Sequence, residues 1–249
     1  MWTALGVLNA AFTTTSGPLD HMGDSSNPPI GLVSQEVGRC RRPLSSNAGH
    51  NCQTMTQQPL IRPVLETERA QAAGLATRAF MGEAFMFGMA GNDPLDRYLA
   101  AHQIYSSEPW DDTAIMMGAF LDDLLVGIVR GSSVGHCTLC RTIDPQHPPA
   151  DEARRKDWEF WVGVRDVHAR HGEHGWISRM AVEPQGQGSG VGSLLIESIM
   201  DELGARGSGA VYLEALRERS GFYEKHGFRS IDEVPEPWAD LSYLMVREV

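Results

Sequence analysis

The sequence of 249 residues lacks features that would place it in several large classes of protein. No apolar run approaches the roughly 20 residues that a membrane-spanning helix needs. The apolar start, residues 1–12, has no positively charged region and so makes a poor secretion signal. Basic residues are few, because 21 Lys and Arg stand against 32 Asp and Glu and give a net charge of −11. We therefore expect a cytoplasmic protein that binds neither nucleic acid nor an anionic membrane surface.

The four cysteines are too few for a disulfide framework in a chain of this length. Cys137 and Cys140 have the spacing of a metal or redox site, and Cys40 and Cys52 are the only other thiols. The second pair does not repeat that spacing, so we expect no metal and interpret the first pair as part of a loop. A zinc-linked redox protein is the alternative, which metal analysis of the purified protein would test.

Polar and turn-forming residues dominate residues 13–58, which have neither helical nor strand periodicity. Such a composition buries too little apolar surface to offset the entropy lost on ordering. We predict that residues 1–55 form a disordered extension and that residues 56–249 form one folded domain. Acidic and basic residues balance over residues 1–54, so the predicted domain carries the whole net charge.

From residue 59 onward, periodicity predicts alternating strands and helices. The predicted strands cover residues 60–64, 113–120, 124–130, 176–182, 209–215, 228–232 and 241–247. The predicted helices cover residues 67–81, 93–105, 151–171 and 193–203, and a further one ends at residue 226. In the helix over 151–171, Trp158, Trp161, Val164 and Val167 form an apolar stripe that suits the core or a subunit contact, which leaves a homodimer open. This order predicts an α/β (α+β) domain with a mixed sheet.

Glycines alternate at the turn between the strand 176–182 and the helix 193–203. They are Gly186, Gly188, Gly190 and Gly192. Glycines let the backbone approach a ligand closely, and the positive end of the next helix then favours an anion such as phosphate. The pattern is not a Rossmann fingerprint, because Ser193 stands where the third glycine would be, and it lacks the lysine of a P-loop.

A second informative segment lies about 30 residues further on, where a helix gives way to a strand at Gly227. A glycine in that place fits a left-handed helix end. In their order and spacing, the two segments resemble motifs A and B of the GNAT (Gcn5-related N-acetyltransferase) superfamily. The resemblance is carried by Gln187-Gly-Ser-Gly-Val-Gly192 after Ala181-Val182 and Pro184, and by Tyr223-Glu-Lys-His-Gly-Phe228.

The wider run over residues 176–247 resembles the puromycin N-acetyltransferase-like branch of this superfamily. Its matching residues are Trp176 to Gly192, Tyr212-Leu-Glu214-Ala, Phe222-Tyr223 and Met245-Val-Arg247. The resemblance implies a mixed, mostly antiparallel central sheet that is flanked by helices and splayed at the acetyl-CoA strand. It also implies an enzyme that moves an acetyl group from acetyl-CoA to a primary amine of a small molecule or peptide by direct transfer. The alternative is a non-catalytic acyl-CoA-binding or regulatory module with the same fold.

The resemblance also implies the roles of individual residues. The pantetheine arm of the cofactor pairs with the strand backbone at Met180, Ala181 and Val182. The pyrophosphate rests on the backbone amides of Gln187, Gly188, Ser189, Gly190, Val191, Gly192 and Ser193. The Met180 N–H donates to the thioester oxygen, and Tyr223 is the general acid, because a phenol is protonated at neutral pH.

The general base stays open at this point. Some relatives have a carboxylate on the strand of motif A, but residues 176–182 contain none. The candidates are Glu214, His174 and Glu83, and a water-mediated route needs none of them. A second departure is Leu216-Arg-Glu-Arg219, where the superfamily often has Asn-x-x-Ala. Acidic residues near the expected acceptor cleft suggest a cationic amine, namely Glu83, Asp93, Asp96, Asp111, Asp112, Glu159 and Asp166.

Overall fold

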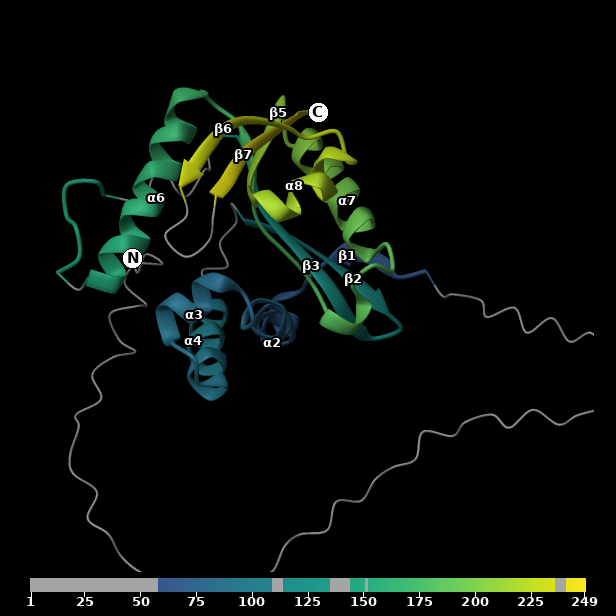
Figure 1. Ribbon diagram of the computed structural model, residues 1–249. Helices are drawn as coiled ribbons and strands as arrows, with labels where there is room; N and C mark the ends of the chain where they lie inside the picture. Colours follow the sequence, from purple (N-terminus) through teal and green to yellow (C-terminus); the bar gives the residue numbers. More distant parts are fainter. Residues whose placement is uncertain (1–57, 109–113, 135–143, 151, 236–240) are drawn as a thin grey trace, which may run out of the picture. The chain divides into compact units, whose positions relative to one another are not determined.

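The computed structural model describes residues 58–108, 114–134, 144–150, 152–235 and 241–249 (Figure 1). The predicted extension over 1–55 and all four cysteines lie outside the described residues. None of the helices in the described ranges combines the length and apolarity that a membrane crossing requires.

The described strands form a seven-stranded sheet in the order β1-β2-β3-β4-β5-β7-β6. Their bounds are β1 Leu60–Pro63, β2 Ala114–Leu121, β3 Leu124–Ser132, β4 Gly175–Val182, β5 Ala210–Leu216, β6 Arg229–Pro235 and β7 Leu241–Glu248. All neighbouring strands are antiparallel except β4 and β5, which run parallel. The predicted mixed, mostly antiparallel sheet is therefore confirmed.

Each predicted helix is present in the described residues. The α-helices are α2 Arg69–Phe80, α3 Ala84–Ala90, α4 Pro94–Ser106, α6 Glu152–Arg170, α7 Val191–Ala205 and α8 Arg217–Glu224. Two 3-10 turns, η1 Glu66–Glu68 and η2 Pro184–Gly186, precede α2 and α7. The sequence analysis missed α3, because its seven residues are six apolar ones and a glycine, and no polar face marks a helical period.

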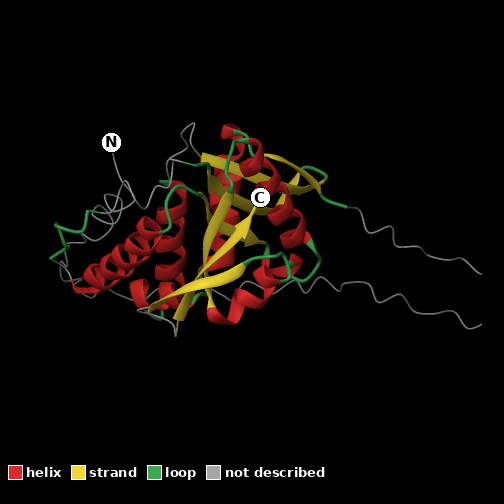
Figure 2. Ribbon diagram, turned by 90° about the horizontal axis from the view of Figure 1, so that it is seen from above, coloured by secondary structure: helices red, strands yellow, loops and turns green. Residues whose placement is uncertain are grey.

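Helices cover both faces of the sheet (Figure 2). Helix α7 lies on one face and buries Leu195, Ile199 and Leu203 against alternate residues of the strands. Helices α2 and α4 cover β2 and β3 on the opposite face, and α6 covers β5, β7 and β6 there. Since successive strand residues point to opposite faces, Val211 of β5 faces α7 whereas Tyr212 faces α6.

The apolar stripe of α6 belongs mainly to the core. Val164 and Val167 are buried in a cluster with residues of β4, β5, β6 and β7, and Trp161 is half-buried against that cluster. Trp158 lies further toward the start of the helix, where its indole N–H donates to the Asp144 carbonyl at 3.1 Å. The same helix places His168 in the interior, with 0% of its surface exposed.

Candidate active site

The two parallel strands part at the centre of the sheet. Strands β4 and β5 pair only at Gly175 with Val211 and at Trp176 with Tyr212. The register between β4 and β3 shifts after Ile177, so that Ser178 is an extra residue in a β-bulge. A bulge bends its strand and increases its twist. Both strands are fully described, and the β5-facing edge of β4 is therefore unpaired beyond Trp176, as the predicted splay requires.

The glycine-rich turn lies at the end of this open strand and begins helix α7. Gly190 is the N-cap residue with φ 90° and ψ −5°, and Gly188 has φ 79°. L-residues rarely adopt this left-handed conformation, so glycine is favoured at both positions. No side chain caps the helix, and the N–H groups of Val191, Gly192 and Ser193 belong to the first helical turn, which lacks intrahelical acceptors. The site is therefore suited to an anion.

The first turn of α7 also packs closely against α8 and β4. A Cβ at Gly192 would lie 3.3 Å from a ring atom of Phe222 and 3.8 Å from the Met180 methyl group. Within the turn, the Ser189 hydroxyl donates to the Gly186 carbonyl at 2.5 Å, and the Gln187 amide donates to the Val182 carbonyl at 3.4 Å. These contacts hold the loop against the residues that are expected to bind the pantetheine arm.

A polar chain connects the loop to motif B. One ring nitrogen of His226 lies 3.0 Å from the Ser193 hydroxyl, and the other lies 3.0 Å from the Glu197 carboxylate. Arg247 donates to both oxygens of Glu197, at 3.1 and 3.0 Å. The hydrogen bond from Arg247 and then that from His226 lower the pKa of Glu197. The two motifs are thus connected by side chains as well as by packing.

Tyr223, the predicted general acid, lies on α8 among apolar residues. Its ring packs edge-on against Phe222, with 5.1 Å between centroids, and against Phe228, with 6.0 Å. Burial raises the pKa of Tyr223 to about 12, and the charges of Arg219 and Glu214 act on it in opposite directions. The phenol is therefore protonated at neutral pH, as a general acid must be, and it lies within electrostatic range of Glu214.

The three candidate bases have different surroundings. Glu214 lies on β5 just past the point where the strands part, and it accepts a hydrogen bond from the Trp176 indole at 3.0 Å and contacts His168. His174 is buried, with one nitrogen 2.8 Å from His168 and the other 2.7 Å from the Gly172 carbonyl. Burial lowers the pKa of His174. With both nitrogens engaged, His174 is a poor base.

Glu83, the third candidate, is the residue before α3 and receives a hydrogen bond from Arg219 of α8 at 3.1 Å. This ion pair is on the surface and joins α3 to α8. Sequence reasoning missed His168, although it lies four residues after the buried Val164 and next to the buried Val167 on α6. The helical spacing of a histidine beside a buried valine was the available signal.

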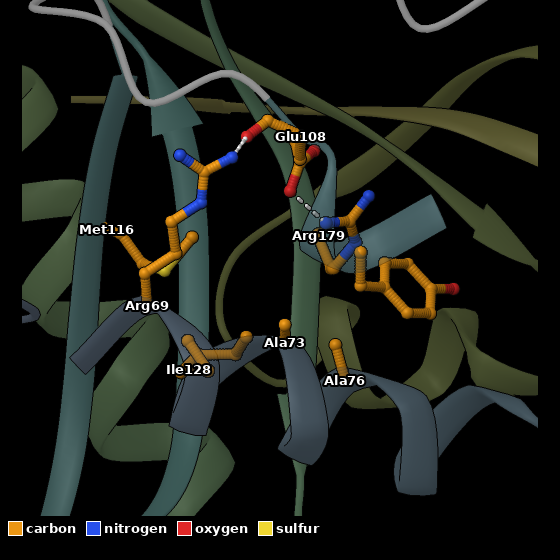
Figure 3. Close-up of a pocket in the computed structure, with 9 residues that line it drawn as sticks. Arg69, Ala73, Ala76, Glu108, Met116, Ile128 and Arg179 are labelled. Atoms are coloured by element: carbon orange, nitrogen blue, oxygen red, sulfur yellow. Dashed lines mark hydrogen bonds and ion pairs between the residues drawn. The ribbon is translucent and has the colours of Figure 1, made fainter. Parts of the chain in front are cut away.

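A pocket lies between α2, α4 and strands β2, β3 and β4 (Figure 3). Its lining includes Ala73 and Ala76 of α2 and Tyr105 of α4. Figure 3 shows Arg69 and Arg179 reaching Glu108 from two sides. Arg69 donates to the Glu108 backbone carbonyl, and Arg179 forms an ion pair with the carboxylate.

Two further interactions define the charge of this pocket. Arg130 lies 3.5 Å from the Glu108 carboxylate, and the Arg179 guanidinium lies 4.4 Å from the Tyr105 ring centroid. Burial raises the pKa of Tyr105, which is therefore neutral at physiological pH. Among the described lining residues, Glu108 is the one carboxylate.

The acidic residues that suggested a cationic acceptor lie outside this pocket. Asp93 caps α4 by accepting from the Leu95 and Asp96 N–H groups, and Asp166 pairs with its neighbour Arg165. Asp96 and Glu159 are exposed, Glu83 pairs with Arg219, and Asp111 and Asp112 lie outside the described residues. None of the described members of this set lines the pocket.

Comparison with known proteins agrees with this geometry. Residues 152–230 match the family model for the acetyltransferase (GNAT) domain. That range contains both the glycine-rich turn and Tyr223. No curated protein matches the chain.

Solved structures share the fold at low sequence identity. A Corynebacterium glutamicum protein, described as histone acetyltransferase HPA2 and related acetyltransferase, is 14% identical with a TM-score of 0.54, over 77% of this chain and 97% of that one. A mosquito arylalkylamine N-acetyltransferase-like protein is 13% identical with a TM-score of 0.57, over 77% and 100%. The Drosophila melanogaster polyamine N-acetyltransferase is 14% identical with a TM-score of 0.56, over 77% and 100%.

The class of protein follows from these findings together. The seven-stranded mixed sheet matches the fold of these acetyltransferase structures. Residues 152–230, which contain the glycine-rich start of α7, match the acetyltransferase (GNAT) domain. These findings support an N-acetyltransferase activity.

Proposed function

We propose that the protein is a cytoplasmic, acetyl-CoA-dependent N-acetyltransferase that transfers the acetyl group directly to a primary amine of a small molecule. The observation that carries this proposal is the uncapped, glycine-rich start of α7, which lies beside the unpaired edge of β4. Backbone N–H groups at this helix end provide the positive charge that a pyrophosphate needs in a protein with a net charge of −11.

The residues present fit the cofactor. Gly188 and Gly190 are left-handed, and no atom lies within 4 Å of the position that a Cβ would take at either residue. The backbone there is therefore open to a phosphate. The unpaired edge of β4 from Met180 to Val182 offers peptide groups to the amide groups of a pantetheine arm. Acetyl-CoA supplies an activated thioester, and the Met180 N–H is the donor that we assign to its carbonyl oxygen.

The acid Tyr223 packs on the α7 face of the sheet, and the base Glu214 contacts His168 on the α6 face. Glu214 takes a proton from the ammonium group of the acceptor, and the freed electron pair of the nitrogen forms the bond to the acetyl carbon. The C–S bond then breaks, and its electron pair leaves with the thiolate, which receives the phenol proton of Tyr223. The second N–H proton restores Tyr223, and the proton on Glu214 passes to water.

We place the acceptor on the face of the sheet where the small pocket of Figure 3 lies. Arg179 lines this pocket. The next residue, Met180, packs on the opposite face of the sheet, against the apolar cluster that contains Leu195 and Ile199 of α7. Because consecutive residues of a strand face opposite ways, an acceptor and a cofactor bound on the two faces would meet at the backbone of β4. The Drosophila relative in the comparison acts on polyamines and forms N-acetylagmatine, and the mosquito relative is named for arylalkylamines.

The experiment is a thiol-release assay with acetyl-CoA and a panel of amines. The panel contains a polyamine, agmatine, an arylalkylamine and an aminonucleoside, the last to test the puromycin-like branch. We expect one class to accelerate release, and Tyr223→Phe to lower kcat by about 10²-fold or more without weakening acetyl-CoA binding in calorimetry. Binding of acetyl-CoA without acceleration by any amine would favour the non-catalytic module instead. Absence of acetyl-CoA binding would refute both.

A further inference from the structure

A line of polar groups runs from the open strands into the interior of the α6 side. It begins at the Glu214 carboxylate, continues through His168 and His174, and ends at the Gly172 carbonyl. His168 is fully buried at the end of α6, and His174 is buried just before β4. The residues come from three elements, and 46 positions separate His168 from Glu214.

The hydrogen bonds determine where the protons lie. The Gly172 oxygen can only accept, so Nδ1 of His174 carries a proton toward it, at 2.7 Å. Burial lowers the pKa of His174, and the neutral ring therefore leaves Nε2 bare. This nitrogen accepts from His168 at 2.8 Å, so Nδ1 of His168 is protonated. One further proton must then lie between Nε2 of His168 and Oε1 of Glu214, since two bare acceptors would repel each other.

Trp176 decides on which side that proton lies. Its indole N–H donates to the second oxygen of Glu214 at 3.0 Å. With the proton on His168, both carboxylate oxygens receive an N–H donor, an arrangement that favours the charged form of a carboxylate. Trp176 also lies edge-on to the His168 ring, 5.8 Å between centroids, and helps to fix its orientation.

We propose, on the basis of the acetyl-transfer function above, that His168 is a positioning residue that holds Glu214 ionised and oriented for proton uptake. His174 acts one step further back and fixes the tautomer of His168. In this arrangement His168 stays protonated and hydrogen-bonded to the carboxylate throughout the reaction. Glu214 takes up the proton from the acceptor's ammonium group. The remaining lone pairs of the carboxylate are those available to the amine.

Few other titratable groups face this line. Tyr212 of β5 packs against His174, with 4.4 Å between the ring centroids. His171, in the turn after α6, packs against Tyr212 in turn, with 5.7 Å between centroids. The charges of His168 and His171 lower the pKa of His174, and that of Glu214 raises it. On the α8 side, Tyr223 and Arg219 share an electrostatic environment with Glu214.

The first test needs no catalysis. Imidazole ¹⁵N shifts distinguish protonated from bare ring nitrogens, and His168→Gln and His174→Gln assign the two rings. At pH 7 we expect both nitrogens of His168 and only Nδ1 of His174 to be protonated. In Glu214→Gln, we expect His168 to lose its second proton. A bare Nε2 on His168 in the wild-type protein would place the proton on Glu214 and overturn the proposal.

The second test measures the pH dependence of turnover. We expect His168→Gln to lower kcat at pH 7 by about 10-fold, part of the 10²- to 10⁴-fold that general base catalysis contributes, with KM for acetyl-CoA unchanged. Without the N–H donor of His168, the charged form of the carboxylate loses one of its two hydrogen bonds, so the acidic limb of the kcat profile should move to higher pH. His147→Gln is the control, because His147 is an exposed histidine whose ring nitrogen contacts Asp144, and its profile should equal that of the wild type.

The double variant separates this role from a structural one. If His168 acts only through Glu214, His168→Gln should cause no further loss of kcat in a Glu214→Gln background. A drop that is equal at all pH values, or a loss that adds fully to that of Glu214→Gln, would overturn the proposal. If the wild-type protein binds acetyl-CoA but acetylates no amine, the proposed function itself fails, whatever the NMR spectra show.

Discussion

The N-cap glycine of α7 offers a sharp test of the cofactor site, through Gly190→Ala. Gly190 and Gly207 lie just before and just after the same helix, with φ of 90° and 87°. In both cases a built Cβ has nothing within 4 Å. The two substitutions therefore have the same backbone penalty and no steric clash, and Gly207→Ala serves as the matched control.

The expected cost to stability follows from the backbone alone. An L-residue in the left-handed region costs about 1–2 kcal/mol, and the lower entropy of the unfolded alanine chain returns about 0.4–1 kcal/mol. Each variant should thus lose about 1 kcal/mol of the free energy of unfolding, or a Tm shift of about 2–4 °C in a domain of this size.

The effect on binding should differ between the two. Alanine at position 190 disfavours the left-handed conformation of this residue. A change of conformation there redirects the N–H groups at the start of α7, where the pyrophosphate is proposed to bind. Loss of one hydrogen bond to a charged group costs about 1.5–3 kcal/mol, so we expect the Kd for acetyl-CoA to rise about 10- to 100-fold. Gly207→Ala should leave that Kd unchanged.

The assay is titration calorimetry with acetyl-CoA, combined with thermal unfolding of both variants in the absence of ligand. Equal stability losses with unequal affinities would support the reasoning. Equal affinities for the two variants would refute the assignment of the α7 start as the pyrophosphate site. Unequal stability losses would instead refute the argument that the two glycines differ only in what they bind.

Two further predictions concern stability. Leu195 of α7 is buried, with 0% exposure, and Leu195→Ala should lower the free energy of unfolding in urea by about 2–5 kcal/mol. Leu194 on the same helix is 42% exposed, and Leu194→Ala should lower it far less. Similar losses for the two variants would contradict the packing of α7. The hydrogen bond from Arg62, and then that from the Leu65 N–H, lower the pKa of Glu68 to about 2 from its ordinary 4.5. Because the pKa is lower in the folded state, this stabilisation is complete above about pH 5 and disappears as the pH falls toward 2. Thermal unfolding should therefore show Glu68→Gln less stable than the wild type at pH 7, with a difference that closes between pH 5 and pH 2; a difference that does not vary with pH would contradict the ion pair.

Local chemistry made much of the fold predictable. The predicted strands 113–120 and 124–130 leave only a short turn between them, and β2 and β3 pair across it, with Asp122 at φ 52°. Gly227 was predicted to have a left-handed conformation, and its φ is 80°. These features depend on a few adjacent residues, whose conformational preferences are present in the sequence itself.

The candidate base was predictable only as one of several. Glu214, His174 and Glu83 could not be ranked from the sequence, because their roles depend on partners that are remote along the chain. The structure gives Glu83 the Arg219 side chain, 136 residues away, and gives Glu214 both His168 and Trp176. Strand register and helix packing bring these groups together, and neither is visible in a local pattern.

The pocket beside β4 shows the same division. It is lined by Arg69 of α2, Arg179 of β4 and Glu108, which follows α4. Their meeting depends on where α2 lies across the sheet. A charge count cannot distinguish a solvated helix face from a pocket wall.

The sequence by itself determined the order of the strands, the glycine-rich turn before α7 and the place of Tyr223 near the end of a helix, because each depends on periodicity or on a short run of residues. Only the tertiary structure decided that β4 and β5 part after a single short ladder, that a bulge at Ser178 accompanies the opening, and that a buried histidine stands behind Glu214. The physical reason is that hydrogen bonds between distant segments form only once packing has fixed the register of the strands and the rotation of α6.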